Sequence, residues 1–272
     1  MEPDLLRNIL HQILLLANAS LSYLAFFRFK DDEKLYSDYR KRIIPVLLNS
    51  IEPSYKYRPS AKIYAKEFLL SGLYHSKLNK LTRQDRILGI YKKAAFSMSF
   101  VKAQSREFIG RSGITGTRNT TYITHFQGLH YVFKVPVNFT GKTVVLPIAN
   151  TDNMDVNEKN EYNLRRLVKN EKKKKIILRN QQFDDSFAVF TNYEKEARNF
   201  LSEKRIKSIL HINALFKYSV ALSFFGNVVF LHAHTDREVF TLNLSKPIDE
   251  QQVLNNYINL KIGLDAMKIL LD

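Results

Sequence analysis

Two runs of alternating apolar and polar residues constrain the fold of this chain more than any other feature. Residues 96–100 read Phe-Ser-Met-Ser-Phe, and residues 129–135 alternate large apolar residues with His130 and Lys134 among the intervening ones. Because successive side chains of a strand point to opposite faces, both runs predict strands with one apolar face. We therefore expect a sheet that buries one side against a core.

Strands and helices are grouped apart along the sequence rather than in regular alternation. Further strands are expected at residues 143–148 and 183–190, and a hairpin is expected around the turn Gly226-Asn227, with a glycine-rich loop at 111–119. Helices are expected at residues 31–52, at about 194–213, and from the cap Asp249 to the C-terminus. The pattern predicts an α+β fold with a mostly antiparallel sheet, a central helix and a C-terminal helix, preceded by N-terminal helices.

The beginning of the chain differs from the rest. Residues 8–27 hold no formal charge if His11 is neutral. This uncharged segment is long enough for a helix that crosses a bilayer. A weak transmembrane helix, an interfacial or partner-packed helix and a buried core helix remain open as interpretations. If this segment spans, everything after Arg28 is expected to be cytoplasmic. We divide the chain into a hydrophobic helix and candidate membrane anchor (1–30), a charged helix with a connector (31–59), and an α+β globular domain (60–272).

The charge of the chain indicates the chemistry of its partner. Lys and Arg number 42 against 26 acidic residues, which leaves a net charge of +16 and favours a polyanionic neighbour. The most basic stretch holds eight cations, which are the candidate anionic-surface-binding residues: Arg165, Arg166, Lys169, Lys172, Lys173, Lys174, Lys175 and Arg179. A solvated segment, an anionic membrane face and nucleic acid are the three interpretations. No aromatic residue lies between Tyr162 and Phe183, which argues against base stacking by this run.

The residues that usually carry catalysis are scarce. The chain has no cysteine, which excludes a disulfide scaffold, a thiolate zinc site and a cysteine nucleophile. The sharpest candidate for a metal site is His232-Ala233-His234, followed by Asp236, because alternate residues of a strand share a face. Neighbouring ligands on one strand face lie about 6–7 Å apart, however, which is wide for one metal ion. We predict no catalytic residue and no cofactor, and keep a metal-dependent enzyme using His232 and His234 as an alternative.

Several short elements occur in a characteristic order along the chain. They are Ser71-Gly72-Leu73-Tyr74, Asp85-Arg86-Ile87-Leu88-Gly89, Phe126-Gln127-Gly128-Leu129, the block 183–190 with Glu196-Ala197-Arg198 and Leu201, and Ser223-Phe224 before the apolar C-terminal helix. From about Tyr36 to Asp272, this ordered set resembles the bacterial domain-of-unknown-function 3137 family. The resemblance implies a cytoplasmic α+β domain attached to N-terminal membrane helices, usually a pair, whereas a single hydrophobic segment fits before residue 30. It implies no catalytic residue.

These features favour a binding protein over an enzyme. We expect a non-enzymatic, membrane-associated domain whose globular part is cytoplasmic and which acts through contacts with a protein partner or an anionic lipid surface. One weak span or one basic patch alone binds a membrane marginally, whereas the two together give a stable attachment. A soluble, cytoplasmic, basic nucleic-acid-binding protein is the alternative.

Overall fold

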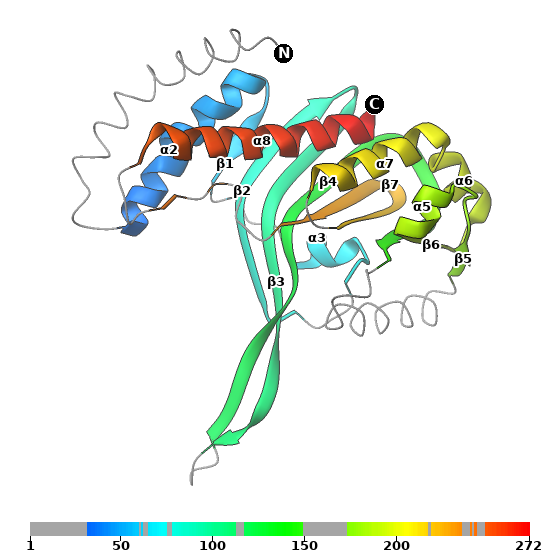
Figure 1. The fold of residues 1–272 in the computed structure, drawn as a ribbon, viewed down its shortest axis with the longest axis horizontal. Helices are drawn as coiled ribbons and strands as arrows, with labels where there is room; N and C mark the ends of the chain where they lie inside the picture. Colours follow the sequence, from blue (N-terminus) through cyan, green and yellow to red (C-terminus); the bar gives the residue numbers. More distant parts are fainter. Residues whose placement is uncertain are drawn as a thin grey trace.

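A single antiparallel sheet organises the molecule. In the computed structural model, the described residues are 32–59, 61, 65–74, 78–112, 117–148, 173–216, 219–235, 240, 242–243 and 248–272. Within them, seven strands form one sheet in the order β1-β2-β3-β4-β6-β5, with β7 also paired to β4 (Figure 1). The strands are β1 (Lys56–Arg58), β2 (Lys80–Tyr91), β3 (Ala94–Ser112), β4 (Thr117–Pro147), β5 (Lys174–Ile176), β6 (Phe187–Thr191) and β7 (Val220–His234). The predicted α+β class is confirmed.

Strand β4 is the central strand of the sheet. Its first half pairs with β3 on one edge, and its residues 128–134 also pair with β7 on the other edge. Its last residues pair with β6 and β7. The two predicted strands at 129–135 and 143–148 are therefore parts of one strand. The register against β7 shifts between Lys134 and Thr143, and Figure 1 shows β4 curving in the body toward β6. This bend lets one strand contact three partners.

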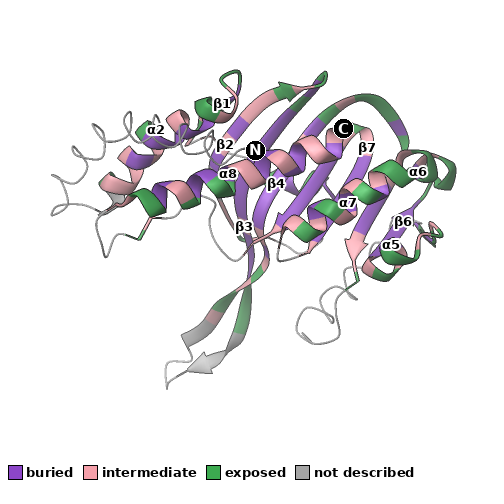
Figure 2. Cartoon of the chain, turned by 45° about the horizontal axis from the view of Figure 1, so that its top comes forward, coloured by how far each residue is buried: buried purple, intermediate pink, exposed green. Residues whose placement is uncertain are grey.

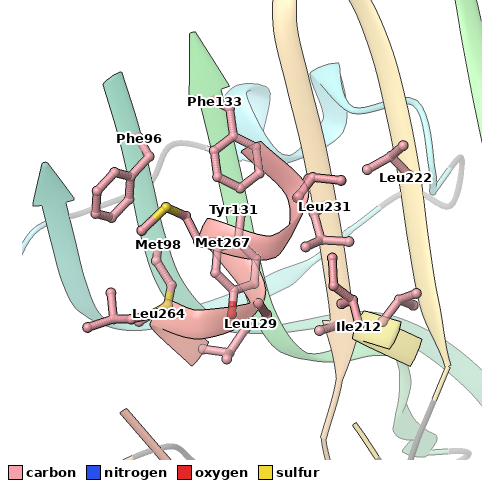
Figure 3. Packing of buried hydrophobic residues seen from close by; sticks show 14 of the residues in the cluster. Phe96, Met98, Leu129, Tyr131, Phe133, Ile212, Leu222, Leu231, Leu264 and Met267 are labelled. Atoms are coloured by element: carbon pink, nitrogen blue, oxygen red, sulfur yellow. The ribbon is translucent and has the colours of Figure 1, made fainter. Parts of the chain in front are cut away.

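Helices cover one face of the sheet. They are α2 (Asp32–Ile51), α7 (Glu203–Leu215) and α8 (Glu250–Leu271), and the strands beneath them are buried (Figure 2). The alternating residues predicted to face a core do so. Figure 3 shows side chains of β3, β4 and β7 packed against Leu264 and Met267 of α8 and against Ile212 of α7. The labelled strand residues are Phe96, Met98, Leu129, Tyr131, Phe133, Leu222 and Leu231.

The C-terminal helix lies close to the sheet and begins where the sequence predicts. The Asp249 side chain accepts a hydrogen bond from the Gln252 N–H at 2.9 Å, which caps the helix. Tyr131 donates to the Gly263 carbonyl at 3.0 Å, and a Cβ at Gly263 would lie 3.2 Å from the Met98 sulfur. The small residue therefore allows the helix backbone to approach β3 and β4.

Helix α2 and strand β1 belong to the same core and sheet as the later elements. Ile43, Ile44 and Leu47 of α2 are buried, and Asn256 of α8 donates to the Tyr39 hydroxyl at 2.8 Å. The predicted helix at 31–52 is confirmed, with Pro45 inside it. The predicted segment 1–30 lies outside the described residues. Among the helices that the structure describes, none has the length and apolarity needed to cross a membrane.

The predicted hairpin around Gly226-Asn227 lies within the segment labelled β7. Residues 220–234 pair antiparallel with β4 on both sides of Gly226. The His234 N–H donates to the Ser219 carbonyl at 3.1 Å, whereas an extended strand would hold these two residues about 50 Å apart. Gly226 has a φ of 53°, which suits the turn. Figure 3 shows Leu222 and Leu231 side by side, so the chain reverses at Gly226-Asn227 as predicted.

Two further predicted elements are divided in the structure. The predicted strand at 183–190 is a helix, α5 (Gln181–Ser186), followed by β6, because Asn180 caps the Phe183 N–H at 3.1 Å. The predicted helix at 194–213 is two helices, α6 (Glu194–Phe200) and α7, separated at Leu201. A short helix, α3 (Ala65–Leu70), also lies on the sheet side opposite α8, where its Phe68 is buried.

Candidate functional site

The sheet face turned away from α2, α7 and α8 changes from exposed to buried along the strands. Its outermost row pairs Ile90 with Ala95, Ala95 with Lys134, and Lys134 with Val228. Ile90 is 70% exposed, and Ala95 and Lys134 are exposed as well. The next row inward is half-buried or buried and consists of Leu88, Ser97, Val132 and Phe230.

Exposed cations lie on the same side of the sheet as this outer row. Lys56 and Arg58 flank Tyr57, which packs on the helix-covered core, so the two cations point to the other side of the sheet. Lys56, Tyr57 and Arg58 line a shallow hollow together with Pro59 and Ala61. We use the name open face for Lys56, Arg58, Leu88, Ile90, Ala95, Val132, Lys134 and Val228. It combines positive charge with exposed aliphatic surface.

The third row of the same face is polar and fully buried. Ser99, His130 and His232 pair across β3, β4 and β7, and each is at most 1% exposed. His130 Nδ1 and His232 Nε2 lie 2.8 Å apart in a hydrogen bond. Their other ring nitrogens, and the Ser99 hydroxyl, have no hydrogen-bond partner among the described residues. Whichever ring donates, the pair leaves one buried N–H and one buried lone pair unused.

Burial keeps these imidazoles neutral. Desolvation lowers the pKa of His130 to about 3 and the pKa of His234 to about 4. The pKa of His232 is also well below its ordinary value, first because of burial and then because His130 and His234 lie nearby. The buried row therefore carries no charge near neutral pH, and it does not exchange protons there.

Helix α3 and the turn after it close over the histidines. The Phe68 and Tyr74 rings stack on His232 with centroid distances of 5.0 and 5.5 Å. The Tyr74 hydroxyl lies 2.9 Å from His234 Nε2, and burial raises the pKa of Tyr74 above its ordinary value. Ser223 donates to the carbonyl of Ser71 at 2.6 Å, which joins this turn to β7. These contacts separate the histidines from solvent.

The surroundings of His232 and His234 do not resemble a metal centre. His232 is hydrogen-bonded to His130, and His234 is hydrogen-bonded to Tyr74. Within the described ranges, no group of three histidine or carboxylate side chains is placed to hold a metal ion. Asp236, the third residue of the predicted cluster, lies outside those ranges.

Two of the ordered sequence elements have structural roles. Asp85, at a φ of 61°, forms an ion pair with Arg40 at 3.2 Å and accepts a hydrogen bond from Tyr57. These contacts join α2, β1 and β2. Gly128 has a φ of 156°, and a Cβ there would lie 2.1 Å from the Ala233 carbonyl oxygen. Only glycine therefore allows β7 to pair so closely at this position.

The predicted basic residues lie at the other end of the sheet, as far as the structure describes them. Lys174 and Lys175 are exposed on β5, Arg179 is exposed just after it, and Lys173 is 2% exposed. Arg165, Arg166, Lys169 and Lys172 lie outside the described residues. Because β5 and β1 are at opposite ends of the strand order, the described part of this run does not join the open face.

Sequence reasoning missed most of the open face. The alternation of residues 129–135 placed His130 and Lys134 on the polar side of their strand, which is where they lie. Lys56 and Arg58, however, fall in a segment whose prolines indicated a turn-rich connector. Their place on the same sheet face as Lys134 depends on β1 pairing with β2, and three residues are too few for an alternating pattern to reveal such a strand.

Comparisons with known proteins found a family model and a solved structure that resemble this chain. A family model described as "Protein of unknown function (DUF3137)" matches residues 124–268. The crystal structure of the mycobacterial trehalose monomycolate transport factor A, TtfA, is similar at 8% sequence identity, with a TM-score of 0.37, covering 84% of this chain and 97% of that one. No curated protein matches the sequence. At that TM-score, the similarity to the transport factor carries no conclusion about function.

Proposed function

The chain belongs to the DUF3137 family of proteins of unknown function, and we propose that it is a docking domain whose open face binds an anionic lipid surface. The observation that carries the proposal is the combination of exposed cations and exposed aliphatic side chains on one side of the sheet. Lys56 pairs with Leu88, and Lys134 lies in the same outer row as Ile90, two strands away. Arg58 lies further along β1, and the three cations and Ile90 are all exposed. Cations attract acidic headgroups, and an apolar side chain gains by leaving water at the interface.

The local charge balance supports this choice. Glu67 lies on the same side of the sheet, but it is ion-paired with Arg86 at 3.1 Å. The hollow between Lys56 and Arg58 is open and shallow, which suits a headgroup better than an enclosed small molecule. His130 and His232, whose pKa values are lowered by burial, are sealed beneath α3. The exposed groups therefore favour binding over acid–base catalysis.

Vesicle co-sedimentation of the full chain tests this function. The chain is mixed with vesicles of phosphatidylcholine alone and with vesicles that also contain phosphatidylserine. We expect preferential binding to the acidic vesicles that weakens as salt is raised, because salt screens exposed charges. The measured quantity is the ratio between the two vesicle types, so that a charge-independent contribution from residues 8–27 cancels. Equal binding to both types would show that the proposed function is wrong.

A matched pair of variants locates the docking surface. Lys56→Glu, Arg58→Glu and Lys134→Glu together reverse the charge of the open face. Each nearby cation contributes roughly 1 kcal/mol at an acidic membrane, so the triple variant is expected to weaken binding by about a hundredfold or more. The control reverses Lys41, Lys195 and Lys207, which are exposed on helices. If both variants lose the same affinity, net charge rather than the open face is responsible.

A further inference from the structure

The ends of β3 and β4 extend beyond the body as a two-stranded ribbon. We use the name arm for residues 105–112 and 117–124, which pair only with each other among the described residues (Figure 1). The pairing of β2 with β3 stops at Gln104, and the pairing of β7 with β4 starts at Gly128. A ribbon of two strands is marginally stable in water, and a third strand stabilises it. Within the described part of the chain, each edge of the arm therefore lacks a neighbouring strand.

Asn79 marks the end of the pairing between β3 and the body of the sheet. The Asn79 N–H donates to the Gln104 carbonyl at 3.0 Å, and the Asn79 side chain accepts from the Arg106 N–H at 2.9 Å. Alternate residues of an antiparallel strand turn their main-chain groups to the same edge. The N–H and C=O of Phe108 consequently point to the same edge of β3 as the Arg106 N–H that donates to Asn79. No described strand pairs with that edge at Phe108.

One face of the arm combines aromatic and basic side chains. The register pairs Arg106 with Tyr122 and Phe108 with Thr120, so these four residues share a face. Phe108 is 57% exposed and Tyr122 is 49% exposed. Arg106 donates to the Thr120 hydroxyl at 3.0 Å, and the Lys80 ammonium lies 5.4 Å from the Tyr122 ring centre. Large exposed rings beside cations are typical of an interaction surface.

The charge of the arm selects among partners. Two cations lie beside its exposed rings: Arg106 contacts Thr120, and Lys80 lies next to Tyr122. Acidic groups brought by a partner would pair with these cations. A second copy of this chain would instead bring the same cations and a net charge of +16. A nucleic acid would match the charge, but it has no alternating N–H and C=O groups with which to pair a strand edge.

We propose that the β3 edge of the arm binds an extended acidic segment of a partner protein as an added strand. The main chain of the partner pairs with β3 from Phe108 outward, and its acidic side chains lie beside Arg106 and Lys80. Main-chain hydrogen bonds supply affinity in this mode, and alternate side chains supply specificity. The arm is separate from the open face, so this partner would bind independently of the lipid surface.

Three short fluorescent peptides test the proposal on the full-length chain. The first alternates glutamate and valine, the second alternates lysine and valine, and the third is the glutamate peptide with N-methyl groups on the main-chain nitrogens of one edge. We expect anisotropy to show the glutamate peptide binding at least about tenfold more tightly than either of the others. We also expect amide exchange at Phe108 to slow when the glutamate peptide is bound.

A pair of charge-reversal variants locates the contact with the peptide. Three other outcomes would contradict the proposal. Arg106→Glu is expected to weaken binding by about tenfold, whereas Lys207→Glu, the same charge change on α7, is expected to leave it unchanged. Equal binding of the N-methylated and unmodified peptides would mean charge attraction without strand addition. Preferential binding of the lysine peptide would contradict the proposed partner chemistry. Displacement of the glutamate peptide by a tighter-binding single-stranded DNA oligonucleotide would assign the arm to nucleic acid instead.

Discussion

The two faces of the sheet are built from the same strands, yet they bury different chemistry. Toward α7 and α8, the side chains of β3, β4 and β7 are large and apolar, with Met98, Tyr131 and Leu231 as neighbours in one row. The residues next to these in sequence, Ser99, His130 and His232, form a row on the opposite face. Both rows are buried, but only the second leaves polar atoms without hydrogen-bond partners in the described part of the chain.

This difference indicates that the two faces contribute differently to stability. Apolar burial stabilises the helix-covered face, because each large side chain gains when it leaves water. Unused polar atoms in the other buried row cost free energy, since water would satisfy them in the unfolded chain. The covered face therefore supplies the stability that allows the opposite face to hold histidines inside and cations outside. The predictions below test this division.

Acidification should have the largest effect. His130 and His232 are neutral when folded and take up protons near their ordinary pKa of about 6.5 when unfolded. Below that pH the unfolded chain binds more protons, so the free energy of unfolding falls as pH falls, until His130 of the folded chain titrates near pH 3. The slope is at most about 1.4 kcal/mol per pH unit for each imidazole. Urea unfolding at a series of pH values measures it.

The double variant His130→Leu and His232→Leu is the control for acidification. It should unfold with a shallower dependence on pH between about 6.5 and 4, because two of the buried imidazoles are gone. A pH dependence as steep as that of the unmodified chain would show that carboxylates elsewhere, rather than this buried row, cause the acid lability.

Truncation on the covered face should have the next largest effect. Phe133 is fully buried, so Phe133→Ala should lower the free energy of unfolding by about 3–5 kcal/mol. The neighbouring Val132 is half-buried on the other face, and Val132→Ala should cost less than half as much. Urea midpoints at an unchanged denaturant slope report both values. Equal losses would mean that the two faces contribute alike to stability.

Removing the histidines one at a time should have the smallest and most specific effect. His232→Leu removes the hydrogen-bond partner of the buried His130 Nδ1 atom. It should lower the free energy of unfolding by about 1–3 kcal/mol at neutral pH. The double leucine variant removes both polar rings and should be less destabilised than the single one. A double-mutant cycle in urea measures this coupling, and additive losses would mean that the imidazole hydrogen bond contributes nothing.

Patterns local in the sequence predicted much of the fold. The period-two alternation correctly placed Phe96, Tyr131 and His130 on their faces, and Asp249 correctly marked the start of α8. Features that depend on distant partners were missed. Gly226-Asn227 correctly predicted the reversal of the chain within β7, but not that both halves of β7 pair with β4. The His130–His232 pair joins residues 102 apart in sequence, and no local pattern encodes that contact.

The role of β4 as a strand shared by β3, β6 and β7 has a consequence for biosynthesis. Its second edge is completed by residues 220–234, which leave the ribosome long after β3 and β4 have emerged. Until then the nascent chain holds an open hydrogen-bonding edge next to apolar side chains, a state prone to aggregation. Helix α2 also cannot complete its packing before α8 is synthesised, because Tyr39 accepts a hydrogen bond from Asn256, which lies 217 residues later in the sequence. Folding is therefore committed only near the end of translation, and a prematurely terminated chain is expected to become a substrate for chaperones and proteases.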